Sequence, residues 1–236
     1  MSKSKVWKWI SGSTLASVAM FAALLFFGLA THPASAAQNR DNTTTVVDVY
    51  NPRTGQVWMD RNLGASRAAT SPSDSRAYGD LYQWGRPADG HQRRKSPATS
   101  TLSSSDQPGH GSFILAPVSP YDWRSPRNDN LWQGVNGVNN PCPEGYRLPT
   151  DAEWDEERKS WVSNNATGAF RSPLKLPMPG YRSNSDGSLV GVDYNGYYWS
   201  STVSRSDARF LFFHHGILGR ASFPRAVGRS VRCIKD

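Results

Sequence analysis

The side chains of this sequence that could do chemistry are few and poorly grouped. Cys142 and Cys233 are its only thiols, and His214 and His215 are its only adjacent imidazoles. A thiolate can act as a nucleophile, so a free catalytic cysteine is one possibility for either position. Neighbouring residues on a strand point to opposite faces, so the two histidines are poorly placed to hold one metal ion together. We expect neither a metal nor a cofactor.

Carboxylates crowd at one place, directly after Pro149. The pattern Thr150-x-x-Glu153 is typical of a capping box, in which each side chain satisfies the other residue's backbone amide at a helix start. Acids there also lie at the positive end of the helix dipole, so a cap and a solvated face explain them better than a paired-carboxylate site. The chain has no Gly-rich phosphate loop and no Gly-x-Ser-x-Gly elbow. We therefore predict no catalytic residues. The acids concerned are Asp151, Glu153, Asp155, Glu156 and Glu157.

The N-terminal segment has the composition of a secretory signal peptide. Lysines precede an uncharged apolar stretch that ends in Ala34-Ser35-Ala36, a small-residue cleavage site. We predict that residues 1–36 are removed and that residues 37–236 form a single exported domain, secreted, periplasmic or at the cell surface, with no membrane span. A retained anchor is the alternative, since a spanning helix needs about 20 apolar residues, close to the length of this stretch. The net charge of +8 is too diffuse to predict nucleic-acid binding.

Export would place the two cysteines in an oxidising compartment. We therefore expect Cys142 and Cys233 to form a disulfide, with a free reactive thiol as the alternative. Closing a loop of about 90 residues would stabilise the fold by up to about 4–5 kcal/mol if the effect is entropic.

The remaining sequence predicts short strands and ordered loops, because Gly, Pro, Ser and Asn recur between short apolar runs. The predicted strands are 44–50, 56–59, 188–192 and 197–201, and the predicted helices are 77–84 and 150–162. Residues 86–140 are irregular yet rich in aromatic side chains, which indicates a packed loop region. Within it, we expect the basic run 91–95 to be solvated. Core packing is the simpler interpretation of Trp58, Trp84, Trp154 and Trp199, and a sugar-stacking platform is the alternative.

Aromatic residues are dense in residues 208–230. If this segment begins as a strand, Leu211 and Phe213 share one face, while Phe210, Phe212 and His214 share the other. One interpretation is a central strand buried on both sides. The other is a core face opposite an exposed aromatic patch, which on a soluble domain usually marks an interaction site.

Several strings of residues together resemble one protein family. In chain order they are GQVWMDRNLGA (55–65), YGDLYQWGR (78–86), CPEGYRLPT (142–150), YWSST (198–202) and GRSVRC (228–233). The set resembles the Fibrobacter succinogenes major paralogous domain family, which is related to the formylglycine-generating-enzyme branch of the C-type lectin fold. The resemblance implies an α+β domain with a twisted, mainly antiparallel sheet, few helices, long ordered loops and one disulfide. It also implies that the disulfide holds the C-terminal strand against the middle of the chain.

The residues do not support the chemistry of these relatives. Catalysis of the formylglycine-generating kind needs a thiol-based copper site, which a structural disulfide would remove. Calcium-dependent sugar binding in true lectins uses Glu-Pro-Asn or Gln-Pro-Asp followed by Trp-Asn-Asp, whereas this chain has only Gln107-Pro108-Gly109. We therefore expect a binding protein rather than an enzyme.

The resemblance also indicates where a binding surface would lie. Relatives tend to carry small polar residues where this chain has bulky ones, while Leu211, Phe213, Arg225, Gly228, Val231, Arg232 and Cys233 look retained. Variable proteins of diversity-generating retroelements use this fold and randomise adenines, chiefly in AAC codons. Replacing those adenines yields the residue types found here, so this sequence is compatible with that origin.

We expect an exported domain that recognises a protein or glycan at a cell surface through rigid aromatic side chains. The alternatives are an enzyme of altered chemistry and a structural envelope component that packs against its own copies. The predicted ligand-binding residues are Arg209, Phe210, Phe212, His214, Ile217, Ser222, Phe223, Val227 and Arg229.

Overall fold

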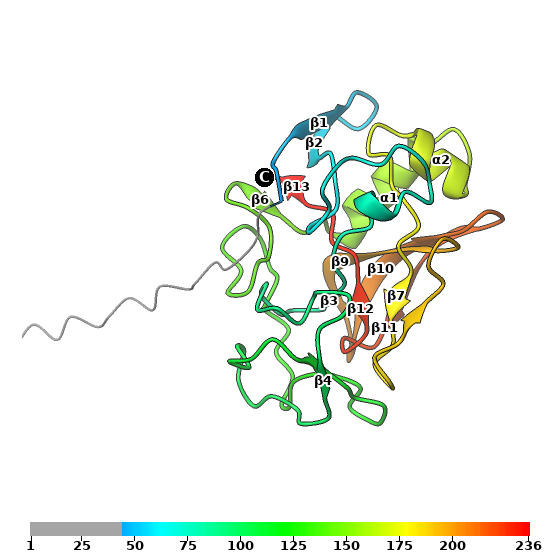
Figure 1. Cartoon of the computed structure of the whole chain (residues 1–236). Coiled ribbons are helices and arrows are strands. Elements are labelled where there is room, and N and C mark those ends of the chain that lie inside the picture. Colours follow the sequence, from blue (N-terminus) through cyan, green and yellow to red (C-terminus); the bar gives the residue numbers. More distant parts are fainter. Residues whose placement is uncertain (1–43) are drawn as a thin grey trace, which may run out of the picture. The chain divides into compact units, whose positions relative to one another are not determined.

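Short strands joined by tight turns dominate the computed structural model, which describes residues 44–236. Gly55 has a φ of +73°, a conformation that glycine adopts without strain, and it closes the turn between Asp48–Asn51 (β1) and Gln56–Met59 (β2). These strands pair antiparallel, which confirms the predicted hairpin. Ile234–Lys235 (β13) pairs with β2, and Tyr146–Arg147 (β6) pairs with β13. The first and last strands therefore share one sheet (Figure 1).

The longest strands form a three-stranded antiparallel sheet of order β11-β10-β9. It consists of Gly196–Ser204 (β9), Asp207–Phe213 (β10) and Leu218–Phe223 (β11). A four-stranded sheet of order β3-β12-β7-β8 lies beside it, built from Tyr82–Gln83, Gly228–Arg229, Tyr181–Arg182 and Leu189–Val190. A parallel bridge between Tyr198 and Ser230 joins the two, so the end of β12 runs along β9.

Two short helices pack on one face of the β9–β10–β11 sheet (Figure 1). Asp151–Lys159 (α1) begins at the predicted Thr150–Glu153 capping box, but it ends at Ser160 instead of continuing to residue 162. Trp161 turns inward there and packs edge-on against Phe213 of β10, at 5.7 Å between ring centroids. Ala166–Arg171 (α2) was not predicted, because a six-residue helix containing Thr and Gly is too short to show a helical period.

The long region 86–140 is ordered, as predicted. It contains Ala98–Thr99 (β4) and Phe113–Ile114 (β5), which pair parallel, and it buries tryptophans whose indole N–H groups find backbone acceptors. Trp123 Nε1 donates to the carbonyl of Trp84 at 2.6 Å, and Trp132 Nε1 donates to that of Asn139 at 2.9 Å. Tyr121 is the exception among the aromatic residues expected to pack here, since its side chain is exposed.

Two predictions for the segment 77–95 are wrong. Residues 77–84 do not form a helix: a 3-10 turn, Ser75–Ala77 (η1), is followed by β3. A helix cannot pass through Gly79, since its φ of +65° lies outside the right-handed helical region. The basic run 91–95 is not wholly solvated, because His91 and Gln92 are buried.

The core contains the tryptophans that the sequence assigned to it. Trp58, Trp84, Trp154 and Trp199 are all fully buried, so core packing is confirmed for them and a sugar-stacking role is excluded. Glu157 corrects the expectation of a solvated acidic helix face. It is fully buried and accepts hydrogen bonds from Asn51 Nδ2 at 2.6 Å and Trp161 Nε1 at 3.0 Å.

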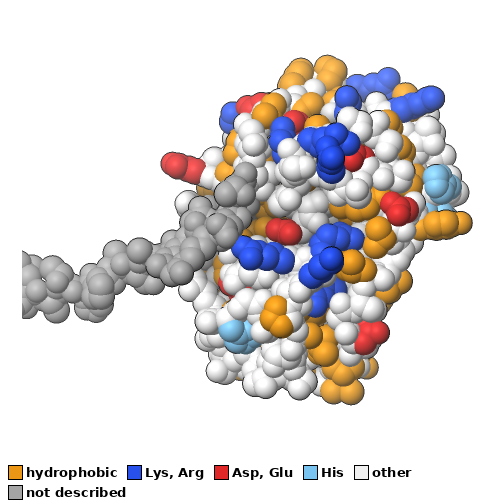
Figure 2. Space-filling view, viewed as in Figure 1, with side chains coloured by type: hydrophobic (Ala, Val, Ile, Leu, Met, Phe, Trp, Pro, Cys, Tyr) orange, Lys and Arg blue, Asp and Glu red, His pale blue; other side chains and the backbone are white. Residues whose placement is uncertain are grey.

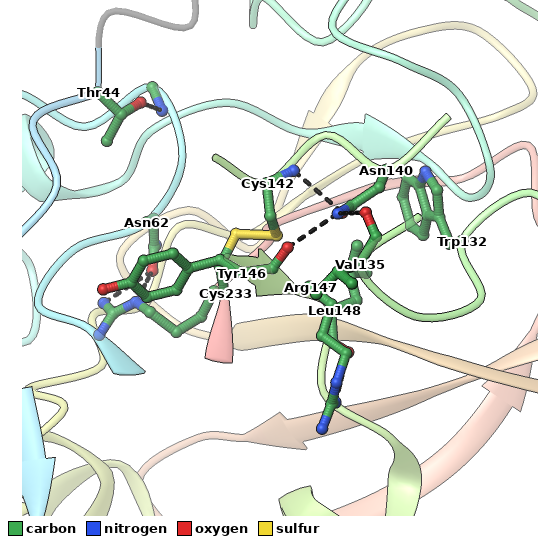
Figure 3. The surroundings of a disulfide bond; sticks show 12 residues. Thr44, Asn62, Trp132, Val135, Asn140, Cys142, Tyr146, Arg147, Leu148 and Cys233 are labelled. Carbon is green, nitrogen blue, oxygen red and sulfur yellow. Dashed lines mark hydrogen bonds between the residues drawn. A yellow bond between two sulfur atoms is a disulfide. The ribbon is translucent and has the colours of Figure 1, made fainter. Parts of the chain in front are cut away.

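The Cys142–Cys233 disulfide is present, with a Cα–Cα distance of 5.9 Å, so no free thiol remains. Asn140 fixes the loop beside it: its side chain accepts from Cys142 N at 3.2 Å and donates to the Tyr146 carbonyl at 2.8 Å (Figure 3). The bond therefore ties the middle of the chain to the segment entering β13.

The described residues thus form a mostly β structure with few helices and one disulfide. Within residues 44–236, no helix combines the length and apolar character that a membrane crossing requires. The predicted signal peptide, 1–36, and the domain boundary at residue 37 lie outside the described residues.

Candidate ligand-binding surface

The β10 strand has two different faces, as its alternating sequence predicts. Phe210 lies opposite Trp199 of β9 and Ala221 of β11, while Phe212 lies opposite Tyr197 and Gly219. Directly paired residues point to the same side of a sheet. We call the side that carries Tyr197, Trp199, Phe210, Phe212 and Phe223 the aromatic face.

The opposite side of the sheet packs against the helices and carries two of the predicted ligand-binding residues. Arg209 and Ser222 are paired with each other on that side. Arg209 lies 3.3 Å from the Asp151 carboxylate at the start of α1, and Arg220 lies 2.6 Å from the same carboxylate. Arg209 and Ser222 are therefore separated from the aromatic face by the sheet.

The aromatic face grades from core to surface. Phe210 is only 5% exposed and belongs to the core cluster that contains Trp84 and Trp132, while Phe212 is half-buried against it. Phe223, at the end of the edge strand β11, is 44% exposed. Neither sequence interpretation holds for the whole face, because its inner part is buried and its outer part meets solvent.

Small residues let the large rings lie against the sheet. A Cβ at Gly219 would be 2.6 Å from the Phe212 ring, so this ring lies over the backbone of β11. Phe210 contacts both outer rings, with centroid distances of 5.9 Å to Phe212 and 6.4 Å to Phe223. The rings form one packed cluster rather than separate side chains, which limits the conformational entropy they would lose on binding.

Arg229 lies within this cluster, although it comes from another sheet. The bridge between Ser230 and Tyr198 brings the end of β12 beside β9, and β7 contributes Tyr181 from the other side. The Arg229 Cζ lies 3.5 Å from the ring centroid of Phe210, 4.9 Å from those of Tyr197 and Trp199, 5.2 Å from that of Phe223 and 6.0 Å from that of Tyr181. We call these five rings the Arg229 cage.

Within residues 44–236, the Arg229 guanidinium is buried without an acid partner. The residue is 3% exposed, and its Nε and Nη1 have no hydrogen-bond partner among the described residues. Burial lowers the pKa of Arg229 to about 9, with the tyrosines Tyr197 and Tyr181 opposing the shift, so the side chain remains charged at neutral pH. Cation–π contacts stabilise the flat faces of the cation but leave its in-plane donors without acceptors.

The other predicted site residues lie at the turn and in the core. His214 and Ile217 belong to the β10–β11 turn, which is closed by a hydrogen bond from His214 N to the Ile217 carbonyl at 2.9 Å. Ile217 is exposed, whereas Val227 is fully buried next to the cage segment and supports the surface from inside.

The resemblance implies that seven positions near the C-terminus are retained. All of them are buried: Leu211, Phe213, Arg225, Gly228, Val231, Arg232 and Cys233. Among the positions that the resemblance implies to vary, Phe210, Val227 and Arg229 are buried, whereas Phe223 and Ile217 are exposed.

Other groups of polar residues are weaker candidates for a functional site than the aromatic face. Asp89 Oδ1 lies 2.6 Å from His91 Nδ1, but His91 Nε2 accepts from Gln83 N at 3.0 Å and the nearby Ser96 hydroxyl donates to a carbonyl, so no Ser–His–Asp relay forms. A hollow of about 860 Å³ beside them is lined by loop residues that range from buried Ser96 to exposed Arg93 and Lys95. No cluster of three potential metal ligands occurs in residues 44–236. On the side drawn in Figure 2, hydrophobic, basic and acidic side chains are interspersed.

Sequence reasoning missed Tyr181 and Tyr197 as members of this surface. Tyr197 could have been found, because it alternates with Trp199 in the predicted strand 197–201. Tyr181 had no local signal, since only the pairing of β7 with β12 brings it to the cage. Comparisons of the chain with protein-family models, curated proteins and solved structures found no match.

Proposed function

We propose that this chain is an exported ligand-binding domain with a C-type-lectin-like fold, related to the Fibrobacter succinogenes major paralogous domain family. Its aromatic face would bind a protein or glycan at a cell surface. The observation that carries the proposal is the continuous ring cluster that runs from buried Phe210 to the 44% exposed Phe223. Large rigid rings bury much apolar area at a small entropic cost, which is why aromatic residues dominate binding hot spots.

Binding has more support than the alternative of an enzyme with altered chemistry. Both thiols are joined in the disulfide, and both ring nitrogens of the buried His91 already have partners. The aromatic face, in contrast, has an open edge at β11 and an exposed ring at Phe223, and the β10–β11 turn exposes Ile217. An envelope component that binds its own copies would use the same surface, and light scattering distinguishes it by its mass.

The burial of the positions implied to be retained, together with the exposure of Ile217 and Phe223, supports the further proposal that the C-terminal surface is diversified over a fixed framework. The DNA around the gene tests it. A near-copy of the 3′ end that differs mainly at adenines, next to a reverse transcriptase gene, would establish diversification. A complete genome without such a copy would refute it.

The binding proposal predicts different effects for substitutions at the two ends of the ring cluster. Phe223→Ser should lower the free energy of unfolding by only about 1 kcal/mol, because the ring packs on Phe210 but is 44% exposed. Phe210→Ser should cost about 3–5 kcal/mol, because it empties a core site. Urea denaturation of both variants measures the difference.

The same Phe223→Ser variant should lose binding at least tenfold when the labelled domain is applied to a glycan array and to whole cells. Val162→Ser, at an exposed apolar position after α1 on the other side of the β9–β10–β11 sheet, is the matched control and should bind as the unsubstituted protein does. Equal binding by the Phe223 variant, or a collapse of its stability, would show that the ring is structural and would remove the proposal.

A further inference from the structure

The Arg229 side chain has more hydrogen-bond donors than the protein satisfies. A buried guanidinium normally pairs with a carboxylate, because removing an unpaired charge from water costs several kcal/mol. Here Nε and Nη1 have no acceptor, and the groups around the cation are aromatic rings. Phe210 lies only 3.5 Å from Cζ and covers a face of the cation, so the unsatisfied N–H groups point along the plane of the guanidinium.

We propose that the aromatic face binds an acidic sugar, whose carboxylate becomes the missing acceptor of Arg229. This inference rests on the proposed function, since it names the chemical class of ligand for the same surface. A carboxylate oxygen accepts in-plane hydrogen bonds from a guanidinium, and such charge-assisted bonds are stronger than neutral ones.

The groups around the carboxylate site fit a sugar ring better than an acidic peptide. The hydroxyls of Tyr181 and Tyr197 donate to no acceptor within residues 44–236, so both remain available to sugar hydroxyl groups. The exposed ring of Phe223 offers an apolar surface on which the C–H groups of a pyranose can stack. The rings of Tyr197, Trp199 and Phe223 lie within 6.4 Å of the Phe210 ring, so the cluster has the dimensions of one monosaccharide rather than of a protein interface.

Phe223 is the route by which a carboxylate reaches the cation. Its ring centroid lies 5.2 Å from the Arg229 Cζ, yet the side chain is 44% exposed at the end of an edge strand. Rotation of this one side chain opens the cage while Phe210 and Trp199 stay fixed in the core. The displaced ring then stacks on the incoming sugar.

The decisive comparison uses sugars that differ by the carboxylate alone. Glucuronic and galacturonic acids are titrated against the purified exported protein by ligand-observed NMR, with glucose and galactose as their neutral counterparts. We expect the acids to bind at least tenfold more tightly, a difference of about 1.4 kcal/mol. The Arg229 Nε–H resonance should shift on adding either acid and should not shift on adding the neutral sugars.

Two substitutions test whether Arg229 causes the preference for acidic sugars. Arg229→Met should abolish the preference for acids, and the variant should melt at the same temperature or higher, because it removes an unpaired buried charge. Arg171→Met is the control, since Arg171 is an exposed cation at the end of α2, on the opposite side of the sheet, and its loss should leave the preference unchanged.

Several outcomes would overturn the inference. They are equal binding of acids and neutral sugars, an unshifted Nε–H resonance, a preference that persists in Arg229→Met, or tighter binding of a blocked Gly-Asp-Gly peptide than of either sugar acid. If Phe223-dependent binding to other glycans or proteins is found while uronic acids are ignored, the acidic-sugar inference fails and the proposed function stands. If no Phe223-dependent binding is found at all, both fail.

Discussion

A single buried histidine shows how this fold fixes a protonation state. His91 Nε2 accepts the backbone N–H of Gln83 at 3.0 Å, so it must carry a lone pair, and Nδ1–H faces Asp89 Oδ1 at 2.6 Å. Burial, reinforced by the nearby charge of Arg86, lowers the pKa of His91 to about 4. The imidazole is therefore neutral at pH 7, and protonation would break the bond to Gln83.

This environment predicts a loss of stability in acid. The pKa of His91 in the folded state lies below the unfolded value of about 6.5, so the unfolded chain takes up the proton first as pH falls. The free energy of unfolding should drop by about 1 kcal/mol per pH unit between about pH 6.5 and pH 4 from this group. Urea denaturation of the unsubstituted protein and of His91→Gln across this range measures the contribution.

The comparison between those two proteins is needed because other groups titrate in the same window. Burial raises the pKa of Asp80 and of Asp122 to about 6. These two groups therefore lower the free energy of unfolding as pH rises, which is opposite to the effect of His91. Both proteins contain Asp80 and Asp122, so the difference between their free energies of unfolding reports the contribution of His91. A difference that does not vary with pH would contradict the assignment.

At the scale of elements, the capping box of α1 predicts a local and separable effect. Thr150 Oγ1 accepts from Glu153 N at 3.2 Å, and Glu153 Oε2 accepts from Thr150 N at 2.7 Å. Thr150→Ala should cost about 1 kcal/mol, the usual value of a lost cap, whereas Thr150→Ser keeps the hydroxyl and should cost much less. Thermal unfolding of the two variants decides: equal losses would mean that the methyl group, not the cap, is what matters.

Elements whose signals lie in neighbouring residues were predictable. Elements that depend on pairing with a segment far along the chain were not. The capping box, the β1–β2 hairpin and the alternation of β10 follow from neighbouring residues, and all three are confirmed. The sequence predicts a helix over 77–84, where β3 lies, because the strand that pairs with β3 is β12, far along the chain, and leaves no local signal.

The candidate site divides in the same way. The faces of Phe210 and Phe212 were predictable from alternation. The burial of Arg229 was not, since five rings from four strands surround it. Local spacing likewise predicts a solvated Glu157, because its partner Asn51 is 106 residues away. Sequence spacing reports which side of an element a residue occupies, whereas burial depends on what other elements bring to that side.

For the described residues as a whole, the disulfide is the connection that most constrains the chain. It joins residues 91 apart and fixes the segment that enters β13, an inner strand that pairs with both β2 and β6. Cys233 is fully buried in the main core cluster, so the bond acts from inside the fold. Reduction releases that constraint chiefly in the unfolded chain.

We predict that reduction lowers the free energy of unfolding by about 2–5 kcal/mol, the range found for native disulfides that close long loops. Urea denaturation with and without dithiothreitol measures this loss, and the slope of the transition should rise because the reduced unfolded chain exposes more surface. Cys142→Ala/Cys233→Ala controls for the reductant: its transition should fall at lower urea and should not move when dithiothreitol is added. If the reduced and oxidised proteins unfold at the same urea concentration, the sheets hold the C-terminal strand without the bond, and its stabilising role would have to be abandoned.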